Sequence, residues 1–206
     1  MTYIVLDTET NGLPDRTNLP FGVFPKYNEI HRYNSARIVQ LSFMICDDNM
    51  NELEKFDFII KNNDKYGFNI TNPEFHNITN KISQNNGIDF IEAYNVLHKY
   101  LDNCKAIIAH NINFDINVIK SELFRRNYID YIVKFSNCKA VCSMVKYKFV
   151  VKAINKKTGY IKNPSLAELY EFAFKEDNLK IENAHNSLYD VITLQKSMKK
   201  IGFNIS

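Results

Sequence analysis

YIVLDTETNGL, residues 3–13, joins a strand-like apolar run to two carboxylates that stand two residues apart. Side chains at positions i and i+2 of a strand lie on one face, so Asp7 and Glu9 can contact the same divalent cation. Surface acids at a strand end would have the same spacing, but the apolar run before them predicts a strand that is buried in a core. The stretch therefore predicts a metal site at the end of the first strand.

Two later segments place further acids near helix starts. AHNINFD, residues 109–115, follows a short apolar run and begins a helical pattern, which puts Asp115 in the first turn. AHNSLYD, residues 184–190, has His185 before a second helical pattern and Asp190 inside it. Taken alone, either aspartate could be a first-turn acid that interacts with the helix dipole. Their order after the first pair favours a shared site.

With these motifs in this order, the chain resembles the DEDDh family of 3′→5′ exonucleases. That family includes RNase T and the proofreading subunit of bacterial replicative DNA polymerase. The resemblance spans most of the chain and fills all five family positions, which are Asp7, Glu9, Asp115, His185 and Asp190. It implies an enzyme that removes nucleoside 5′-monophosphates from the 3′ ends of single-stranded DNA or RNA. A role in DNA replication or repair, beside a DNA polymerase partner, belongs to the same expectation.

The resemblance also implies two Mg²⁺ or Mn²⁺ ions, and hard carboxylate oxygens suit both metals. Asp7 would bridge the two ions. Glu9 and Asp190 would bind the ion that activates water, and Asp115 would support the second ion, largely through water. His185 would accept the proton of the attacking water, since an imidazole titrates near neutral pH.

Three further residues are expected to contact the terminal nucleotide because of their places in the motifs. Thr10 and Leu13 follow the metal pair, as do their counterparts in the family. His76 stands in PEFHNIT, residues 73–79, which is similar to a family segment with a histidine near the nucleotide pocket.

The segment from Tyr131 to Ala167 carries eight lysines and no acidic residue. The aromatic residues Tyr147, Phe149 and Tyr160 stand among the lysines, a combination that suits a single-stranded nucleic acid with bases stacked on the rings. A solvated, lysine-rich flap explains the composition equally well. The lysines are Lys134, Lys139, Lys146, Lys148, Lys152, Lys156, Lys157 and Lys162, of which Lys146 and Lys148 are the candidates for substrate contact.

The pattern of apolar residues predicts an α/β protein with a mixed sheet. Strands are expected near 3–8, 36–47, 53–61, 105–109 and 138–142, and helices near 88–103, 112–127, 165–175 and 187–200. A hairpin turn at 48–51 would make the first strands antiparallel, and the later alternation of strands and helices would make the rest parallel. This arrangement agrees with the five-stranded RNase H-like fold, flanked by helices, that the resemblance implies.

Length and composition, with 45% hydrophobic residues and a net charge of +3, indicate one domain over residues 1–206, which the resemblance implies is an exonuclease domain. No apolar stretch is long enough to cross a membrane and no secretion signal is visible, so we expect an intracellular protein. That location would be the cytoplasm, or the nucleus or a viral factory for a virus-encoded chain. The four cysteines lack metal-ligand spacing and are expected to be buried, reduced thiols.

Two other functions fit parts of the sequence. A non-catalytic nucleic-acid-binding module could share the fold, although all five family residues are present. An endonuclease of the RNase H type would share fold and metals, but it leaves His185 without a role.

Overall fold

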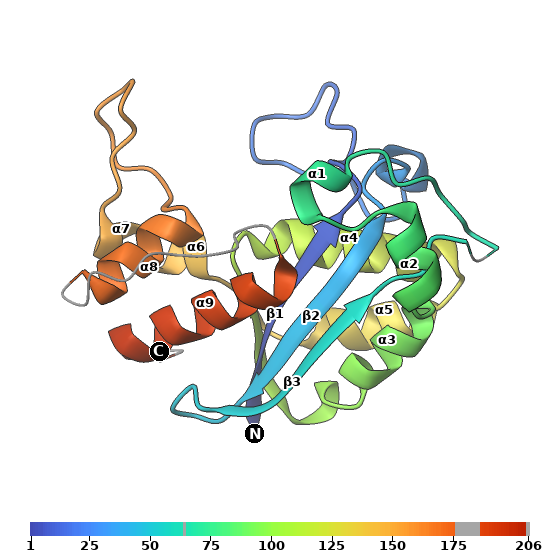
Figure 1. The fold of residues 1–206 in the computed structure, drawn as a ribbon. Helices are drawn as coiled ribbons and strands as arrows, with labels where there is room; N and C mark the ends of the chain where they lie inside the picture. The colour runs from blue at the N-terminus through green and yellow to red at the C-terminus, as the bar shows by residue number, and fades with distance from the viewer. Residues whose placement is uncertain (64, 176–185, 205–206) are drawn as a thin grey trace.

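The computed structural model describes residues 1–63, 65–175 and 186–204, and its centre is a five-stranded mixed sheet (Figure 1). The strand order is β3-β2-β1-β4-β5. β2 pairs antiparallel with both β1 and β3, whereas β4 runs parallel to β1 and to β5, as predicted. The strands are β1 (Thr2–Thr10), β2 (Ile38–Cys46), β3 (Glu52–Ile59), β4 (Cys104–Ala109) and β5 (Ala140–Cys142).

Helices cover both faces of the sheet (Figure 1). α3, α4 and α5 pack on one face, and α8 and α9 pack on the other. The α-helices are α1 (Pro73–His76), α2 (Asn80–Asn86), α3 (Phe90–His98), α4 (Ile112–Arg125), α5 (Ile129–Asn137), α6 (Ser143–Lys146), α7 (Lys148–Val151), α8 (Leu166–Phe174) and α9 (Ser187–Ile201). Two short 3₁₀ helices, η1 (Ile30–Tyr33) and η2 (Leu101–Asn103), complete the elements of the described residues.

The alternation of side chains along β1 builds two cores at once. Ile4 and Leu6 point to the core under α3, α4 and α5, whereas Tyr3 and Val5 point to the core under α8 and α9. Asp7 and Glu9 continue the second series because they also have odd numbers. The two carboxylates therefore emerge at the end of β1 on the face that α9 covers.

The polar turn between β2 and β3 depends on Asp47, one residue before the predicted turn. Its Oδ1 atom accepts the backbone N–H groups of Asn49 and Asn51, at 2.9 and 2.7 Å. Met50 takes a left-handed conformation with φ of 60° and is buried. This Asx-type turn lets β3 return along β2.

Two helix predictions need correction. The helix expected over 88–103 is α3, which starts after the N-cap Asp89 and stops at His98. The chain then turns through η2 into β4, so the end of the apolar pattern belongs to a turn and a strand start. The sequence analysis also missed α5. The left-handed residue Asn127, with φ of 63°, separates α5 from α4, and α5 has only nine residues, too few to show a clear helical pattern.

A buried ionic group joins the start of β2 to the helix layer. Glu122 of α4 is flanked by the guanidinium groups of Arg37 and Arg126, with a distance of 2.5 Å from Arg37 Nε to Glu122 Oε1. Burial raises the pKa of Glu122, but the two arginines outweigh it, and the pKa is lowered. Removing either arginine would leave a buried charge without part of its compensation.

All four cysteines are free thiols, in agreement with the sequence, but only Cys46 is fully buried. The other three are half-buried, which corrects the expectation for them. Over residues 1–63, 65–175 and 186–204, no helix combines the length and the apolar character that crossing a membrane requires.

Candidate metal centre

Three carboxylates from two elements meet at the end of β1. Asp7 and Glu9 come from β1, and Asp190 comes from the first turn of α9. One oxygen from each of the three lies within 4.8 Å of the others. Residues separated by 181 to 183 positions in the sequence are thus brought together by packing α9 across the sheet.

Asn186 defines where α9 begins. Its side-chain oxygen accepts the N–H groups of Leu188 and Tyr189, at 3.2 and 3.4 Å. An N-cap of this kind satisfies backbone donors that have no partner inside the helix. The helix start is therefore determined locally, four residues before Asp190.

Asp115 approaches from the opposite side of β1. It lies in the first turn of α4, which follows the left-handed residue Asn111. Its Oδ1 atom accepts two bonds from Thr8, one from the backbone N–H at 3.1 Å and one from the hydroxyl at 2.8 Å. Asp115 is buried and does not belong to the group of three. It stands beside that group because Thr8 lies between Asp7 and Glu9.

The carboxylates raise one another's proton affinity. Burial first, and then the charges of Asp115, Asp190 and Glu9, raise the pKa of Asp7 well above its ordinary value. Burial and the charges of Asp190 and Asp115 raise the pKa of Glu9 to about 7. Burial raises the pKa of Asp115 to about 7, even though the hydrogen bonds from Thr8 lower it.

No described lysine or arginine forms an ion pair with Asp7 or Glu9. Crowded carboxylates without a cationic side chain are costly, and a divalent cation would remove that cost. An all-oxygen donor set is the type that Mg²⁺ and Mn²⁺ prefer. The residues present therefore fit a hard divalent cation.

A cavity of about 350 Å³ opens beside the carboxylates. Glu9 and Thr10 line it, together with the exposed side chains of Leu13 and Phe75. The Thr10 hydroxyl donates to the Gly12 carbonyl at 2.8 Å, which shapes the loop after β1. Lining residues are Thr8, Glu9, Thr10, Asn11, Gly12, Leu13, Asn72, Phe75 and Phe114.

His76 occupies a different environment from the one expected. It is 2% exposed, and its Nδ1 atom accepts the backbone N–H of Ile78 at 3.1 Å. Burial lowers its pKa. Its neighbour Phe75, rather than His76, lines the cavity. Contact between His76 and a substrate stays a prediction.

Phe75 and Phe114 are lining residues that the sequence analysis missed. Both stand one residue from a position that it singled out, since Phe75 precedes His76 and Phe114 precedes Asp115. An aromatic residue beside a predicted site residue was the available signal. Only the structure decides which of the two neighbours faces the cavity.

The lysine-rich segment divides into parts with different surroundings. Lys146 Nζ lies 5.2 Å from the ring centroid of Phe203, which packs on Tyr3 at the opposite end of β1 from Glu9. Lys148 Nζ lies 5.5 Å from the ring of its neighbour Phe149. The structure therefore does not bring Lys146 to the carboxylates. Tyr147 is only 4% exposed and cannot stack with a base, which corrects its expected role.

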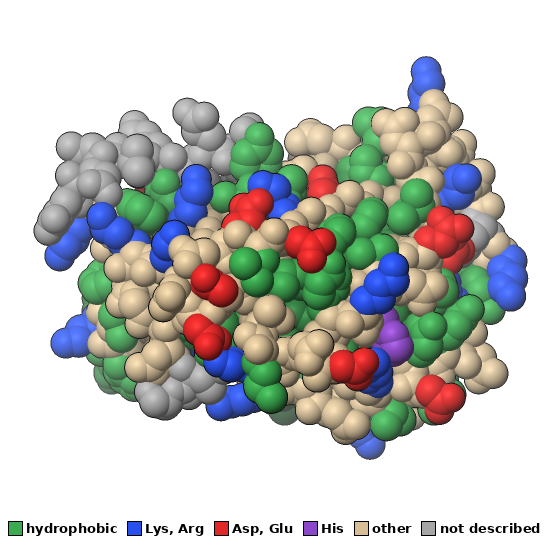
Figure 2. All heavy atoms as spheres, turned by 90° about the horizontal axis from the view of Figure 1, so that it is seen from below, with side chains coloured by type: hydrophobic (Ala, Val, Ile, Leu, Met, Phe, Trp, Pro, Cys, Tyr) green, Lys and Arg blue, Asp and Glu red, His purple; other side chains and the backbone are tan. Residues whose placement is uncertain are grey.

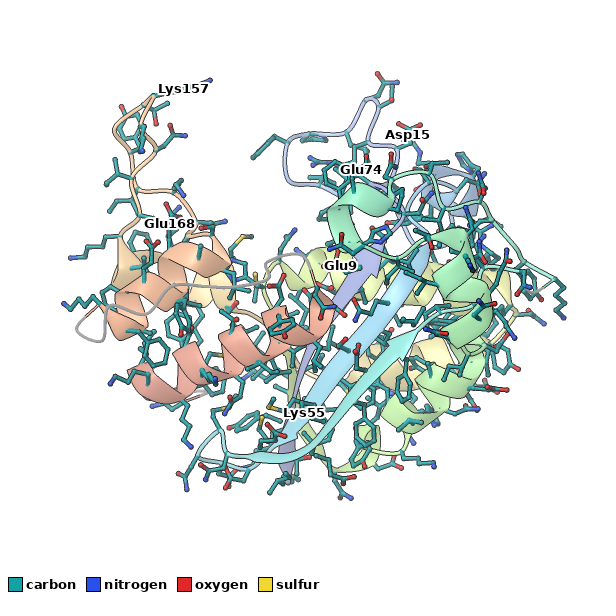
Figure 3. All side chains as sticks on the ribbon, viewed as in Figure 1. Glu9, Asp15, Lys55, Glu74, Lys157 and Glu168 are labelled. Carbon is teal, nitrogen blue, oxygen red and sulfur yellow. The ribbon has the colours of Figure 1, made fainter. Side chains whose placement is uncertain are left out.

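Residues 152–162 form a projecting hairpin, here called the lysine hairpin. Ile154 and Ile161 pair across it, and Gly159 turns the chain with φ of 72°. Figure 3 shows Lys157 at its tip, on the same side of the molecule as Glu9, while α1 with Glu74 and the loop with Asp15 stand across from it. Tyr160 is 78% exposed. The hairpin thus presents lysines and an exposed ring on the side of the carboxylates.

The opposite side of the molecule has a different charge pattern. On the face seen in Figure 2, acidic and basic side chains are interspersed. Near the β2–β3 turn, Lys105 pairs with Asp48, and Lys55 of β3 pairs with Glu52 at 3.0 Å. By contrast, the exposed hairpin lysines Lys152, Lys156 and Lys157 form no ion pair with any described residue.

His185 lies outside the described residues. Its assignment therefore rests on the sequence motif alone.

The family model described as Exonuclease, of the RNase T type, matches residues 4–197. The chain belongs to this exonuclease family, which confirms the resemblance drawn from the three motifs. The mixed sheet with helices on both faces is the RNase H-like exonuclease fold. None of the curated proteins matches the chain.

Solved structures of exonuclease I have the same fold. E. coli exonuclease I in complex with a dA16 oligonucleotide gives a TM-score of 0.68 at 17% identity, over 97% of this chain and 40% of that chain. The zinc-bound form of the E. coli complex with single-stranded DNA gives the same values. A product-bound exonuclease I gives 0.66 at 16% identity, over 97% and 43%. This chain therefore spans about two fifths of the length of these proteins.

Proposed function

We propose that residues 1–206 act as one metal-dependent 3′→5′ exonuclease domain that hydrolyses the terminal phosphodiester bond of single-stranded DNA or RNA. The main observation behind this proposal is that carboxylate oxygens of Asp7, Glu9 and Asp190 lie within 4.8 Å of one another, beside a cavity. The family membership and the single-stranded DNA complex of E. coli exonuclease I support the substrate class. The products would be nucleoside 5′-monophosphates.

Asp7, Glu9 and Asp190 would hold one Mg²⁺ or Mn²⁺ ion, and Asp7 with Asp115 would hold a second. Bound metal would supply charge stabilisation of the attacking and leaving oxygens. A supporting role at the second ion suits Asp115, because its Oδ1 atom already accepts two hydrogen bonds from Thr8. His185 would take the proton of the attacking water. Each of these roles is expected to require the ionised carboxylates and a neutral imidazole.

The cavity beside Glu9 would receive the 3′-terminal nucleotide. Phe75, Leu13 and Phe114 would contact the base or sugar, and their apolar side chains suit any of the four bases. The next nucleotides would pass the lysine hairpin, where Tyr160 could stack. Lys148 stays a candidate contact at the base of this hairpin. An intracellular location and a DNA polymerase partner remain predictions from the sequence.

The test is degradation of oligonucleotides labelled at the 5′ or the 3′ end. We expect a 5′-labelled single strand to shorten stepwise, and a 3′-labelled strand to release a mononucleotide at once, with Mg²⁺ or Mn²⁺ but not with chelator. Parallel DNA, RNA and duplex substrates identify the preferred one. Internal cleavage products would favour the RNase H-type endonuclease, and tight binding without cleavage would favour the non-catalytic module.

The lysine hairpin gives a second prediction. Replacing Lys152, Lys156 and Lys157 by glutamine should weaken binding of single-stranded DNA and flatten its salt dependence. Each lost phosphate contact on a single strand changes the slope of log affinity against log salt by about 0.7, so the slope should fall by about 2. The measurement is a salt series of fluorescence anisotropy titrations, with the metal replaced by chelator to prevent cleavage.

The matched control replaces three lysines that are already ion-paired, Lys55, Lys105 and Lys134. This control variant also removes three positive charges, but from other parts of the surface. We expect a smaller change of slope than for the hairpin variant. Equal slopes for both triple variants would assign the hairpin to the solvated-flap alternative.

A further inference from the structure

A row of polar side chains lies beside the metal carboxylates, under the first turn of α9. In the register of the sheet, Ser42 of β2 stands opposite Asp7, and Gln40 stands opposite Glu9. Asp57 of β3 continues the row because it stands opposite Ser42. Ser42 and Gln40 are 0% and 2% exposed. Polar groups at such positions are retained in a core only when they are hydrogen-bonded.

The row bonds directly to the start of α9. The hydroxyls of Ser42 and Ser187 are 2.5 Å apart, and the backbone N–H of Ser187 donates to Gln40 Oε1 at 3.3 Å. Asp57 Oδ1 accepts from Gln40 Nε2 at 2.8 Å and from the Ser42 hydroxyl at 2.6 Å. β2 therefore holds the first residue of the helix through its backbone and its side chain, and Asp57 of β3 bonds to both of the β2 side chains involved.

The available donors and acceptors determine which group donates each hydrogen bond in this network. A carboxylate only accepts hydrogen bonds, so the single proton of Ser42 goes to Asp57. The bond between the serines must then be donated by Ser187 to Ser42. Likewise, the Gln40 amide turns its NH₂ group to Asp57, which leaves Oε1 to accept the N–H of Ser187. Asp57 thus orients both side chains that bond to Ser187.

We propose that Gln40, Ser42 and Asp57 are positioning residues that hold the first turn of α9 and so place Asp190 against Asp7 and Glu9. Ser187 and Asp190 are three residues apart, about one helical turn, so a displacement of Ser187 moves the carboxylate with it. The inference rests on the proposed metal site. Outer hydrogen bonds of this kind orient metal ligands and tune affinity in metalloproteins generally.

The test compares Asp57→Ala with Asp57→Asn by calorimetric titration of Mn²⁺ into the full chain without substrate. Both variants lose the charge of Asp57, but asparagine keeps an oxygen acceptor for Ser42 and Gln40. We expect Mn²⁺ affinity to fall about 10-fold in Asp57→Ala and to stay within about 2-fold of the parental value in Asp57→Asn. Amide hydrogen exchange at Leu188 to Asp190 should become faster in the alanine variant alone.

Ser42→Ala should weaken Mn²⁺ binding to a similar degree, because it removes the link between Asp57 and Ser187. The matched control is Ser83→Ala. Ser83 is also 0% exposed and also bridges two segments, donating to Ile60 O at 2.7 Å and accepting from Asn62 N at 2.9 Å. It makes these bonds away from α9, so its loss should lower thermal stability without changing Mn²⁺ affinity.

If the parental protein binds Mn²⁺ and both Asp57→Ala and Ser42→Ala keep its affinity, the positioning role is wrong. The proposed metal site would then still stand. Equal losses in Asp57→Ala and Asp57→Asn would also overturn the positioning role, since charge rather than orientation would be responsible. A parental protein that binds no Mn²⁺ would overturn the proposed metal site and the positioning role together.

Discussion

Asp7→Asn is expected to reduce metal-dependent cleavage to the level seen with chelator, while the protein stays folded. Asp7 lies close to the other three carboxylates, since the charges of Asp115, Asp190 and Glu9 all raise its pKa. Asparagine has nearly the same size but cannot supply the charge that a divalent cation requires. Single-turnover cleavage at saturating Mg²⁺, with folding followed by circular dichroism, measures the effect.

The matched control is Asp102→Asn, which neutralises an exposed carboxylate that pairs with Lys134 at 2.8 Å. Its cleavage rate should equal the parental rate. Parental activity in Asp7→Asn would make the assignment of Asp7 as a metal ligand wrong.

The same Asp7→Asn substitution should stabilise the metal-free protein. A carboxyl whose pKa is raised by folding favours the fold at low pH and loses that contribution as pH rises towards the folded pKa. For Glu9 and Asp115 the loss extends from about their ordinary values, 4.5 and 3.8, to about 7. In chelator, Asp7→Asn should therefore raise Tm by several degrees at pH 8 and by much less at pH 4. A melting series across this pH range checks the sign.

His185→Ala is expected to lower turnover by on the order of 10²-fold or more, with metal affinity and substrate binding close to parental. The reason is chemical, because a general base acts in the transition state and holds neither metal nor substrate. The low-pH arm of the rate profile should report in part the titration of His185, since only a neutral imidazole accepts a proton. Single-turnover rates between roughly pH 5.5 and 9 measure both effects.

His31→Ala serves as the control for His185→Ala, since His31 lies in η1 rather than in a motif. It should leave rate and profile unchanged. A His185→Ala protein with parental rates would exclude this residue from the mechanism and favour the RNase H-type alternative.

The local sequence predicted the strands and the longer helices, and it singled out the carboxylates of the candidate metal centre. The period-two pattern of β1 places Asp7 and Glu9 on one face, and this holds for any strand with that sequence. The family motifs then connected this pair with Asp115 and Asp190. Such short-range rules need no knowledge of the partner elements. They failed where the pattern was short, as in α5, or where the end of a helix was decided by a following turn, as in α3.

Only the tertiary structure decided which side chains meet. Phe75 rather than His76 faces the cavity, and Lys146 packs on Phe203 far from Glu9, because each depends on elements distant in sequence. The anchoring of α9 by Gln40, Ser42 and Asp57 was equally invisible, since its bonds join residues 145 to 147 positions apart. A sequence pattern indicates which side chains share one face of a single helix or strand. Contacts between elements depend on the packing of all of them, and that is why the sequence could predict the clustered carboxylates but not the hydrogen bonds that hold α9 beside them.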